Sequence, residues 1–320
     1  MKNLKKVGLS ALAGSLVAFS ANAVEMSVSG TAEVTYTTNS GSSSVTGNPF
    51  GSNTSVKFSG SGDVGFGTAT IVRTINDGLG SAFLSAYTTL DMGAMGKLSF
   101  DAVGGGLEGT SAHDDILPTA YEEVWNQVSG TGVLGAASND TIGYRNTVMG
   151  ATISLARTGG GTAGSVDGIN EGEGNTTSSI SDWHISMPIP YVDGLTVAYG
   201  QSKTEFAIQT ENDDTSMVGH LLYSTGPMSI GYRIAEQQDG SNGSNGLNVE
   251  AYAIAFNVND EMSVSLATQD TEYDVPSGTN ITESVDAINA SYTVGAASVR
   301  ATFSESTNDG GVTGTTDEHM

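Results

Sequence analysis

The chain of 320 residues has no cysteine, and only 11 Lys or Arg residues stand against 35 Asp or Glu. Without cysteine there is no disulfide, no thiolate nucleophile and no Cys-type zinc site. The scarcity of basic residues argues against nucleic acid as a partner, because binding to phosphates requires a basic footprint. The same excess of carboxylates predicts that the protein attracts cations.

The chain also lacks an apolar run long enough for a membrane-spanning helix, which needs about 20 residues. Its longest such run, Val7 to Phe19, follows a basic start over Lys2 to Lys6 and precedes Ala21-Asn22-Ala23. A basic start, a short apolar middle and a small-x-small site are typical of an export signal. The sequence predicts a signal peptide over residues 1–23, cleaved after Ala23, and one exported domain over 24–320.

What the exported part does have is glycine, 43 residues in the whole chain, and segments of about ten residues with a period of two. In the first segment, Met26 to Thr37, apolar side chains alternate with Ser, Glu and Thr. Two such segments, Thr54 to Gly62 and Val64 to Ile75, are joined by a tight turn and predict a hairpin. Twelve further strands are expected over 83–90, 95–102, 139–148, 151–158, 178–188, 195–203, 215–225, 228–236, 247–258, 261–271, 283–294 and 297–306.

Every second connection between these 15 segments is very short, and the long ones are rich in Asp, Asn, Gly and Ser. Tilted strands of this length and alternating short and long connections are typical of outer-membrane β-barrels. In the segment 247–258, Tyr252 and Ile254 share one side while Ala251 and Ala253 share the other. We therefore expect an all-β transmembrane antiparallel barrel with a polar, water-filled interior, since a soluble barrel would fill its interior with large apolar side chains.

One connection, about 103–138, is far longer than usual and combines carboxylates with apolar residues such as Leu117 and Trp125. It follows Gly96-Lys97-Leu98-Ser99-Phe100 and includes a short stretch, Ala120 to Trp125, that we expect to be helical. A fifth strand that enters such a loop resembles the Gram-negative general porins, in particular those of alphaproteobacteria. The resemblance implies a 16-stranded barrel, usually a trimer, whose third loop folds into the lumen and constricts it. It places four acidic residues at the constriction, namely Asp114, Asp115, Glu122 and Glu123.

The resemblance also implies basic wall residues opposite these acids. The candidates on the predicted strands are Lys57, Arg73, Lys97, Arg145, Arg233 and Arg300. Lys57 and Arg145 share a strand side with Ser and Thr, whereas Arg73 shares its side with Ile71 and Ile75. The competing interpretation is that a strand Arg lies at the lipid headgroup level or pairs with a loop carboxylate.

The four constriction carboxylates could instead hold Ca²⁺, which takes six to eight oxygen ligands. Paired carboxylates are also the machinery of glycosidases, but acidic pairs recur throughout the loops and nothing orients them. The four histidines are scattered, and no Ser/His/Asp arrangement can be placed. We therefore expect no enzymatic activity.

The function expected from these features is passive diffusion of small hydrophilic solutes and ions, with a preference for cations, through a homotrimeric porin in the lipid of the outer membrane. A substrate-selective porin would show the same strand pattern. A secreted acidic β-rich surface protein or adhesin is a further alternative, although adhesin repeats should show a fixed self-similar period.

The number of expected strands is odd, whereas bacterial single-chain barrels have an even number. The last residues, 317–320, follow a loop and contain no apolar strand pattern. The sequence therefore predicts that a sixteenth, C-terminal strand is missing and that the strand beginning at Met26 lacks one neighbour. Unpaired backbone groups at such an edge are costly in a membrane.

Overall fold

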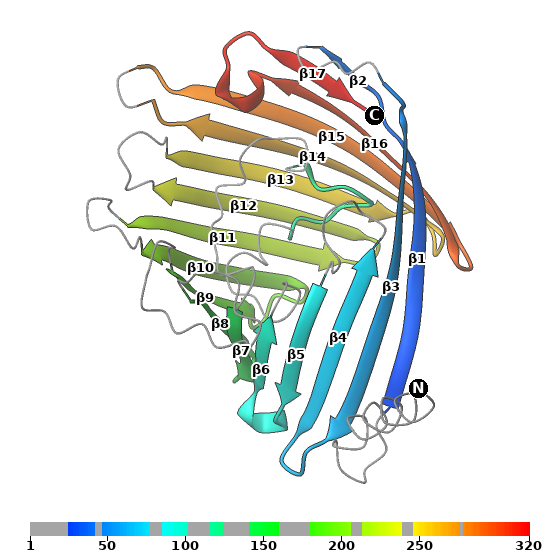
Figure 1. The fold of residues 1–320 in the computed structure, drawn as a ribbon. Helices are drawn as coiled ribbons and strands as arrows, with labels where there is room; N and C mark the ends of the chain where they lie inside the picture. The colour runs from blue at the N-terminus through cyan, green and yellow to red at the C-terminus, as the bar shows by residue number, and fades with distance from the viewer. Residues whose placement is uncertain are drawn as a thin grey trace, which may run out of the picture.

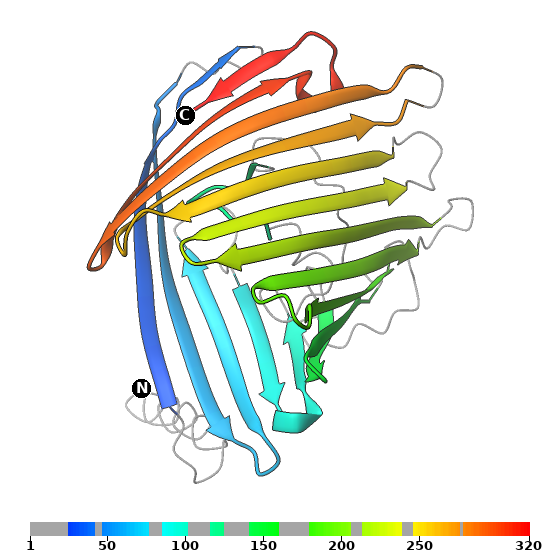
Figure 2. The ribbon, with the colours of Figure 1, turned by 180° about the vertical axis from the view of Figure 1, so that it is seen from behind.

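The computed structural model describes residues 25–41, 47–76, 85–101, 116–124, 141–159, 179–205, 213–238, 246–275 and 278–320. These residues form a single antiparallel sheet of 17 strands, which curls into a barrel (Figures 1 and 2). Among the described residues no helix is long and apolar enough to span a membrane. The expected all-β barrel architecture is confirmed.

Most strands are eight to 14 residues long. The first eight are β1 (Glu25–Tyr36), β2 (Asn39–Gly41), β3 (Phe50–Asp63), β4 (Thr68–Asn76), β5 (Ser85–Asp91), β6 (Lys97–Asp101), β7 (Thr141–Val148) and β8 (Ala151–Thr158). The others are β9 (Ser179–Pro188), β10 (Leu195–Glu205), β11 (Asp214–Thr225), β12 (Met228–Gln238), β13 (Leu247–Asn257), β14 (Met262–Tyr273), β15 (Ile281–Val294), β16 (Ala297–Thr307) and β17 (Thr316–His319). Within the described ranges, two short 3₁₀ turns lie between strands, η1 (Gly93–Met95) and η4 (Asp309–Gly311).

Each strand from β3 to β17 pairs with the next one along the chain. β1 pairs with β3, and β2, which continues β1 after two residues, pairs with β17. The 17 strands therefore occupy 16 barrel positions, because β1 and β2 share one. The resemblance had implied this number.

The end of the chain differs in part from the sequence interpretation, which expected the sixteenth strand to be missing and the strand beginning at Met26 to lack one neighbour. Within the described residues β1 does pair with β3 alone, but a short strand follows β16. Thr316–His319 form β17, which lies between β16 and β2. The backbone amide of Thr38 donates to the carbonyl of Met320 at 2.7 Å, and the Met320 amide donates back at 2.9 Å. Backbone hydrogen bonds hold this strand of polar residues in place. Such pairing leaves no apolar pattern in the sequence, so the strand was not predicted.

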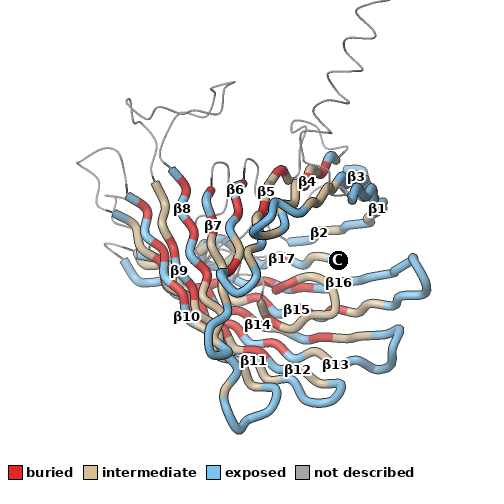
Figure 3. Tube along the Cα trace, turned by 90° about the horizontal axis from the view of Figure 1, so that it is seen from below, coloured by how far each residue is buried: buried red, intermediate tan, exposed pale blue. Residues whose placement is uncertain are grey.

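The two faces of the sheet carry different side chains, as the period of two requires. On the inner face small and polar residues are buried, among them Ser154, Ser202, Thr271 and Ser304. In the part of the chain that the structure describes, most of the buried apolar residues belong to three small clusters rather than to one core. Figure 3 shows buried and exposed positions alternating along the strands. The interior is therefore polar, and the large apolar side chains lie on the outer face.

The outer face is layered along the strand direction. Next to the short turns lie apolar residues such as Ile230, Ile254 and Leu266. Farther along the strands are two aromatic pairs, Trp183 with Tyr199 and Tyr232 with Tyr252, with ring centroids 5.6 and 4.8 Å apart. An apolar band bordered by aromatic side chains is the pattern of a lipid-facing barrel surface.

Short turns close the hairpins, and some of them need glycine. Gly194, in the turn before β10, has φ = +81°, and an added Cβ would lie 2.0 Å from the carbonyl oxygen of Ser224. Gly150 has a similar φ of +85°, but nothing lies within 4 Å of its Cβ position. The two glycines thus separate the cost of the backbone angle from the cost of a clash.

We expect Gly194→Ala to lower the free energy of unfolding by about 2 kcal/mol or more, since the strained φ and the clash with Ser224 act together. Gly150→Ala should lower the free energy of unfolding by only about 1 kcal/mol, because only the strained φ contributes there. Denaturant unfolding of protein folded in detergent micelles, followed by tryptophan fluorescence, measures both. Equal losses in the two variants would contradict the close approach at Gly194.

Candidate functional site: the inner segment and the opposite wall

The described part of the long connection, residues 116–124, packs against the inside of the barrel wall. We call it the inner segment. Leu117 contacts Ala251 and Ala253 of β13, and Val124 contacts Val285 and Ala287 of β15. Leu117 is 4% exposed and Val124 is 1% exposed, so both are anchors. Figures 1 and 2 show the segment on the concave side of the sheet, near β12 to β14.

The wall has small residues where the segment lies, and the closest approach is at Gly231 of β12. A Cβ at this position would lie 2.4 Å from Cδ of Pro118 and 2.8 Å from Cδ2 of Leu117. Any side chain at position 231 would therefore displace the segment. Gly219 of β11 faces outward, and its Cβ would make only ordinary contacts, the nearest at 3.5 Å.

Hydrogen bonds from the wall satisfy the irregular backbone of the segment. The amide of Ala120 donates to Oγ of Ser265 at 2.9 Å, and the amide of Glu122 donates to Oδ1 of Asn289 at 3.2 Å. Within the segment, Thr119 Oγ1 donates to the carbonyl of Glu122 at 2.8 Å. Backbone groups in a bent segment need such partners, since no helix or sheet supplies them.

The expected helix from Ala120 to Trp125 is not present in its described part. Residues 120–122 are bends, residue 123 has no regular structure, Val124 has 3₁₀ geometry, and Trp125 lies outside the described residues. The contacts with Ser265 and Asn289 take the place of helical hydrogen bonds at these amides. Wall contacts thus outweigh the weak helical preference of a short stretch.

Tyr121 joins the segment to two further strands. Its hydroxyl donates to Oε1 of Glu33 on β1 at 3.4 Å, and the guanidinium of Arg300 on β16 lies 5.4 Å from the centre of its ring. Burial, followed by the carboxylates of Glu122 and Glu33, raises the pKa of Tyr121 to about 12. The phenol therefore stays a neutral hydrogen-bond donor at all physiological pH values.

Five of the six predicted basic residues are on the inner face. Lys97 and Arg145 are register partners on β6 and β7, and they share their strand side with buried Ser99 and Thr141. β6 and β7 lie half-way round the 16 positions from β14 and β15, where the inner segment is anchored (Figure 3). This pair therefore faces the segment across the interior.

The other three inner basic residues lie elsewhere on the wall. Lys57 pairs with Ser29 and Thr74 on the inner face near β1. Arg233 is fully buried, and its Nη2 donates to Oε1 of Gln269 at 2.9 Å. Arg300 lies beside Tyr121, as described above.

Arg73 is placed differently, on the outer face of β4. Its neighbours Val72 and Thr74 are the buried, inward residues of this strand, and its register partner on β3 is Phe58. Its Nη1 donates to the carbonyls of Val72 and Tyr87 at 2.6 and 3.2 Å. The inclusion of Arg73 among the inner wall residues was wrong, as the parity of its neighbours indicates.

Of the four predicted acidic lining residues, the structure describes two. Glu122 and Glu123 lie in the inner segment, and Glu123 is 5% exposed. Asp114 and Asp115 lie outside the described residues, as does Ala23 at the predicted cleavage site. Within the described ranges no three His, Asp or Glu side chains come together as a metal site. A calcium ion at the four carboxylates stays a prediction.

The sequence interpretation missed several residues that shape the interior. Ser265 and Asn289 hold the inner segment, and only their inward parity could have marked them. His184 and His220, on β9 and β11, are buried on the inner face and stack with ring centroids 5.7 Å apart and an interplanar angle of 15°. The two histidines are 36 positions apart in sequence, so no local spacing pairs them, whereas β10 alone separates them in the sheet.

The arrangement has a clear chemical consequence. A carboxylate-bearing segment on one wall and a Lys97–Arg145 pair on the opposite wall cannot neutralise each other across a polar gap. Separated charges of this kind orient water and favour polar solutes over apolar ones, and their balance biases the passage of ions.

Comparison with solved structures shows the fold to which this arrangement belongs. The outer-membrane protein OmpT of Vibrio cholerae is 13% identical with a TM-score of 0.65, over 94% of this chain and 97% of that one. OmpF of Salmonella typhi, solved in complex with daunomycin, is 11% identical with a TM-score of 0.67, over 93% and 96% of the two chains. An anion-selective porin from Comamonas acidovorans is 15% identical with a TM-score of 0.61, over 92% and 97%.

Comparison of the sequence itself gives no such match. No family model matches the chain, and no curated protein matches it in sequence. At 11–15% identity the solved structures establish the fold alone, that of the porin barrels of Gram-negative outer membranes.

The position of the inner segment on the barrel wall can be tested by disulfide cross-linking, because the chain has no native cysteine. Cysteines in place of Ala120 and Ser265 should form a disulfide, given the 2.9 Å contact between these residues. Adding Gly231→Ala should reduce the disulfide yield several-fold, since its Cβ would push Pro118 and Leu117 away. The matched Gly219→Ala should leave the yield unchanged. Equal yields in both backgrounds would contradict the close approach at Gly231.

Proposed function

We propose that this chain, which has the fold of the porin barrels, forms a water-filled channel for the passive diffusion of small hydrophilic solutes and ions across a Gram-negative outer membrane. The predicted signal peptide over residues 1–23 would export it, and lipid would surround its apolar outer face. It would act without catalysis and assemble as a homotrimer. A solved structure of V. cholerae OmpT is described as a trimer form, which supports this last point.

One observation carries the proposal, namely the polar inner face with a segment of chain anchored on it. Ser, Thr, Asn and Gln line the interior, whereas a closed soluble barrel would have a large apolar core. The inner segment narrows this space on the side of β12 to β15. A narrowed polar passage admits small hydrated solutes and hinders large or apolar ones.

The sign of the ion preference follows from the inward charges. Among the described residues of the sheet and the inner segment, eleven carboxylates have inward parity or lie on the segment, namely Glu25, Glu33, Asp63, Asp91, Asp101, Glu122, Glu123, Asp182, Asp214, Glu283 and Asp317. The inward basic residues are five. The C. acidovorans porin is anion-selective, so the fold does not fix the sign of the selectivity and the charges do. We propose a preference for cations, which salt would weaken, because the Debye length is only about 10 Å at 0.1 M.

Planar bilayer recordings test the proposed channel. The purified, folded protein should insert in discrete steps of conductance that grow with salt concentration. Failure of correctly folded protein to conduct would contradict the proposal. A protein that leaves the cell envelope in salt without detergent would contradict its membrane location.

The reversal potential in a salt gradient tests the ion preference. Neutralising the inner segment with Glu122→Gln and Glu123→Gln, together with Asp114→Asn and Asp115→Asn, should lower the cation preference by a factor of about two or more. The control is Asp286→Asn with Glu305→Gln, a pair of register partners on the outer face. This pair should leave the reversal potential unchanged. An unchanged potential in the inner variant would remove these acids from the ion path.

A further inference from the structure

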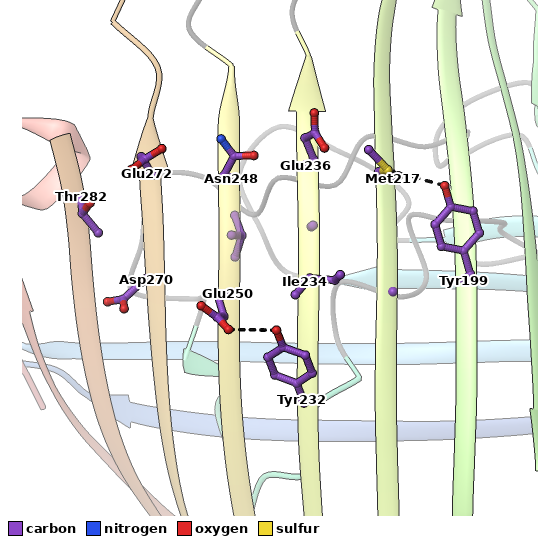
Figure 4. A pocket seen from close by; sticks show the side chains of 13 residues that line it. Tyr199, Met217, Tyr232, Ile234, Glu236, Asn248, Glu250, Asp270, Glu272 and Thr282 are labelled. Carbon is purple, nitrogen blue, oxygen red and sulfur yellow. Dashed lines mark hydrogen bonds between the residues drawn. The ribbon is translucent and has the colours of Figure 1, made fainter. Parts of the chain in front are cut away.

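The outer face of the sheet has a groove that the proposed channel does not use. It has a volume of about 490 Å³ and runs across β10 to β15, where Tyr199 and Tyr232 of the two aromatic pairs form part of its lining (Figure 4). Tyr199, Met217, Tyr232 and Ile234 form its aromatic and apolar part, and Gly219 leaves room between them. Glu236, Glu250, Asp270 and Glu272 line the rest.

The carboxylates of the groove lie close together on neighbouring strands. Glu250 and Asp270 are register partners on β13 and β14, and both are exposed. Like charges directly opposite each other destabilise a sheet. Tyr232 donates to Oε1 of Glu250 at 2.9 Å and Ser284 donates to Oδ1 of Asp270 at 2.6 Å, but these donors carry no positive charge. No basic side chain of the described residues forms an ion pair with either carboxylate, so this pair can attract a cation from outside the chain.

The depth of the groove sharpens this requirement. With the usual rise and tilt of barrel strands, Glu250 and Asp270 lie about 20 Å from the short turns, whereas the lipid-facing band of such barrels is about 25 Å tall. The carboxylates are thus near the upper edge of that band. Uncompensated charge on a lipid-facing surface is unfavourable, and it becomes more so with depth.

The geometry favours an organic cation over a metal ion. Among the described residues no three carboxylates or histidines converge as a metal site, and Ca²⁺ takes six to eight oxygen ligands. An ammonium group needs only two or three acceptors, and it is attracted to the faces of tyrosine rings. Tyr232 and Tyr252 lie beside Glu250, and both donate to its Oε1.

The surface next to the groove suits an alkyl chain. Ile254 and Leu266 are register partners on β13 and β14, on the outward side toward the short turns, and both are exposed. A molecule whose charged head reached Glu250 and Asp270 could lay an apolar tail along these residues. Charge and shape therefore match the two ends of one amphiphile.

We propose that this groove binds amphiphiles with an ammonium headgroup, with the head at Glu250 and Asp270 and the alkyl tail on the apolar band below. The inference uses the membrane placement of the proposed function but not its conductance. Binding in the groove takes place on the lipid side and leaves the lumen open.

Isothermal titration with dodecylammonium, for protein held in uncharged detergent micelles, tests the inference. The wild type should bind about one molecule per chain, and dodecyl sulfate should not compete for the site. Glu250→Gln with Asp270→Asn should weaken binding at least tenfold. The matched control, Asp286→Asn with Glu305→Gln, removes two charges from register partners on the same face but outside the groove lining, and should bind like the wild type.

Several results would overturn the inference. Equal weakening in both double variants would show general attraction to negative charge, and no weakening in either would place the amphiphile elsewhere. Binding of Mg²⁺ alone that the groove variant loses would show a metal site. The single variants Glu250→Gln and Asp270→Asn, each of which should weaken binding, repeat the test if the double variant does not fold. Bilayer conductance should be the same in all variants, so failure here leaves the channel proposal intact.

Discussion

In the proposed membrane channel, the structure depends on one constraint: every backbone amide and carbonyl of the sheet must be paired within the protein. The continuous ladder from β3 to β17 meets this constraint for most of the barrel. It also fixes the side-chain directions, since a strand held on both edges must alternate between inside and outside. The polar interior, the apolar outer band and the position of each charge all follow from that alternation.

The inner segment is where the constraint has to be met in another way. Irregular backbone is tolerated at membrane depth only where it is buried in protein or lines a water-filled cavity. Ser265 and Asn289 accept hydrogen bonds from its amides, while Leu117 and Val124 hold it by apolar contact. The wall residues that contact these anchors are Gly231, Ala251, Ala253, Val285 and Ala287, and four of the five are Gly or Ala. The wall and the segment are therefore complementary in shape as well as in hydrogen bonding.

The carboxylates of the groove on the outer face are placed by the same inward–outward alternation of side chains. Glu250 and Asp270 face outward because Val249, Ala251 and Gln269 face inward. Their strands cannot hide them without reversing every other side chain. A charge on that face must therefore lie where water reaches it or be compensated by a bound ligand. The aromatic pair Tyr232 and Tyr252, next to Glu250, lies where we expect the apolar band to meet water.

The alternation made much of the fold predictable from sequence. The period of two in segments such as 247–258 identified strands and their inward side, and this parity correctly placed Lys57 and Arg145 inside. It also marked Arg73 as an outward residue, although the resemblance had suggested the wall. Local patterns succeed here because each strand is held by its neighbours in a simple order.

What could not be predicted depends on contacts between distant residues. β17 has no apolar pattern and exists through its pairing with β16 and β2. The bent form of residues 120–122 depends on Ser265 and Asn289, more than 140 positions away. The stacking of His184 on His220 follows from the register of three strands. None of these has a local signature in the sequence.

The most direct test of the account is cysteine accessibility in a conducting channel, which the absence of native cysteine makes clean. Single cysteines would replace inward Ser291 and Thr302, and outward Ile288 and Phe303, on β15 and β16. A charged, water-soluble thiol reagent should modify positions 291 and 302 and lower the single-channel current, and should leave positions 288 and 303 unmodified. Equal modification of both sets, or modification of 291 and 302 without any change in current, would contradict a water-filled passage through the barrel.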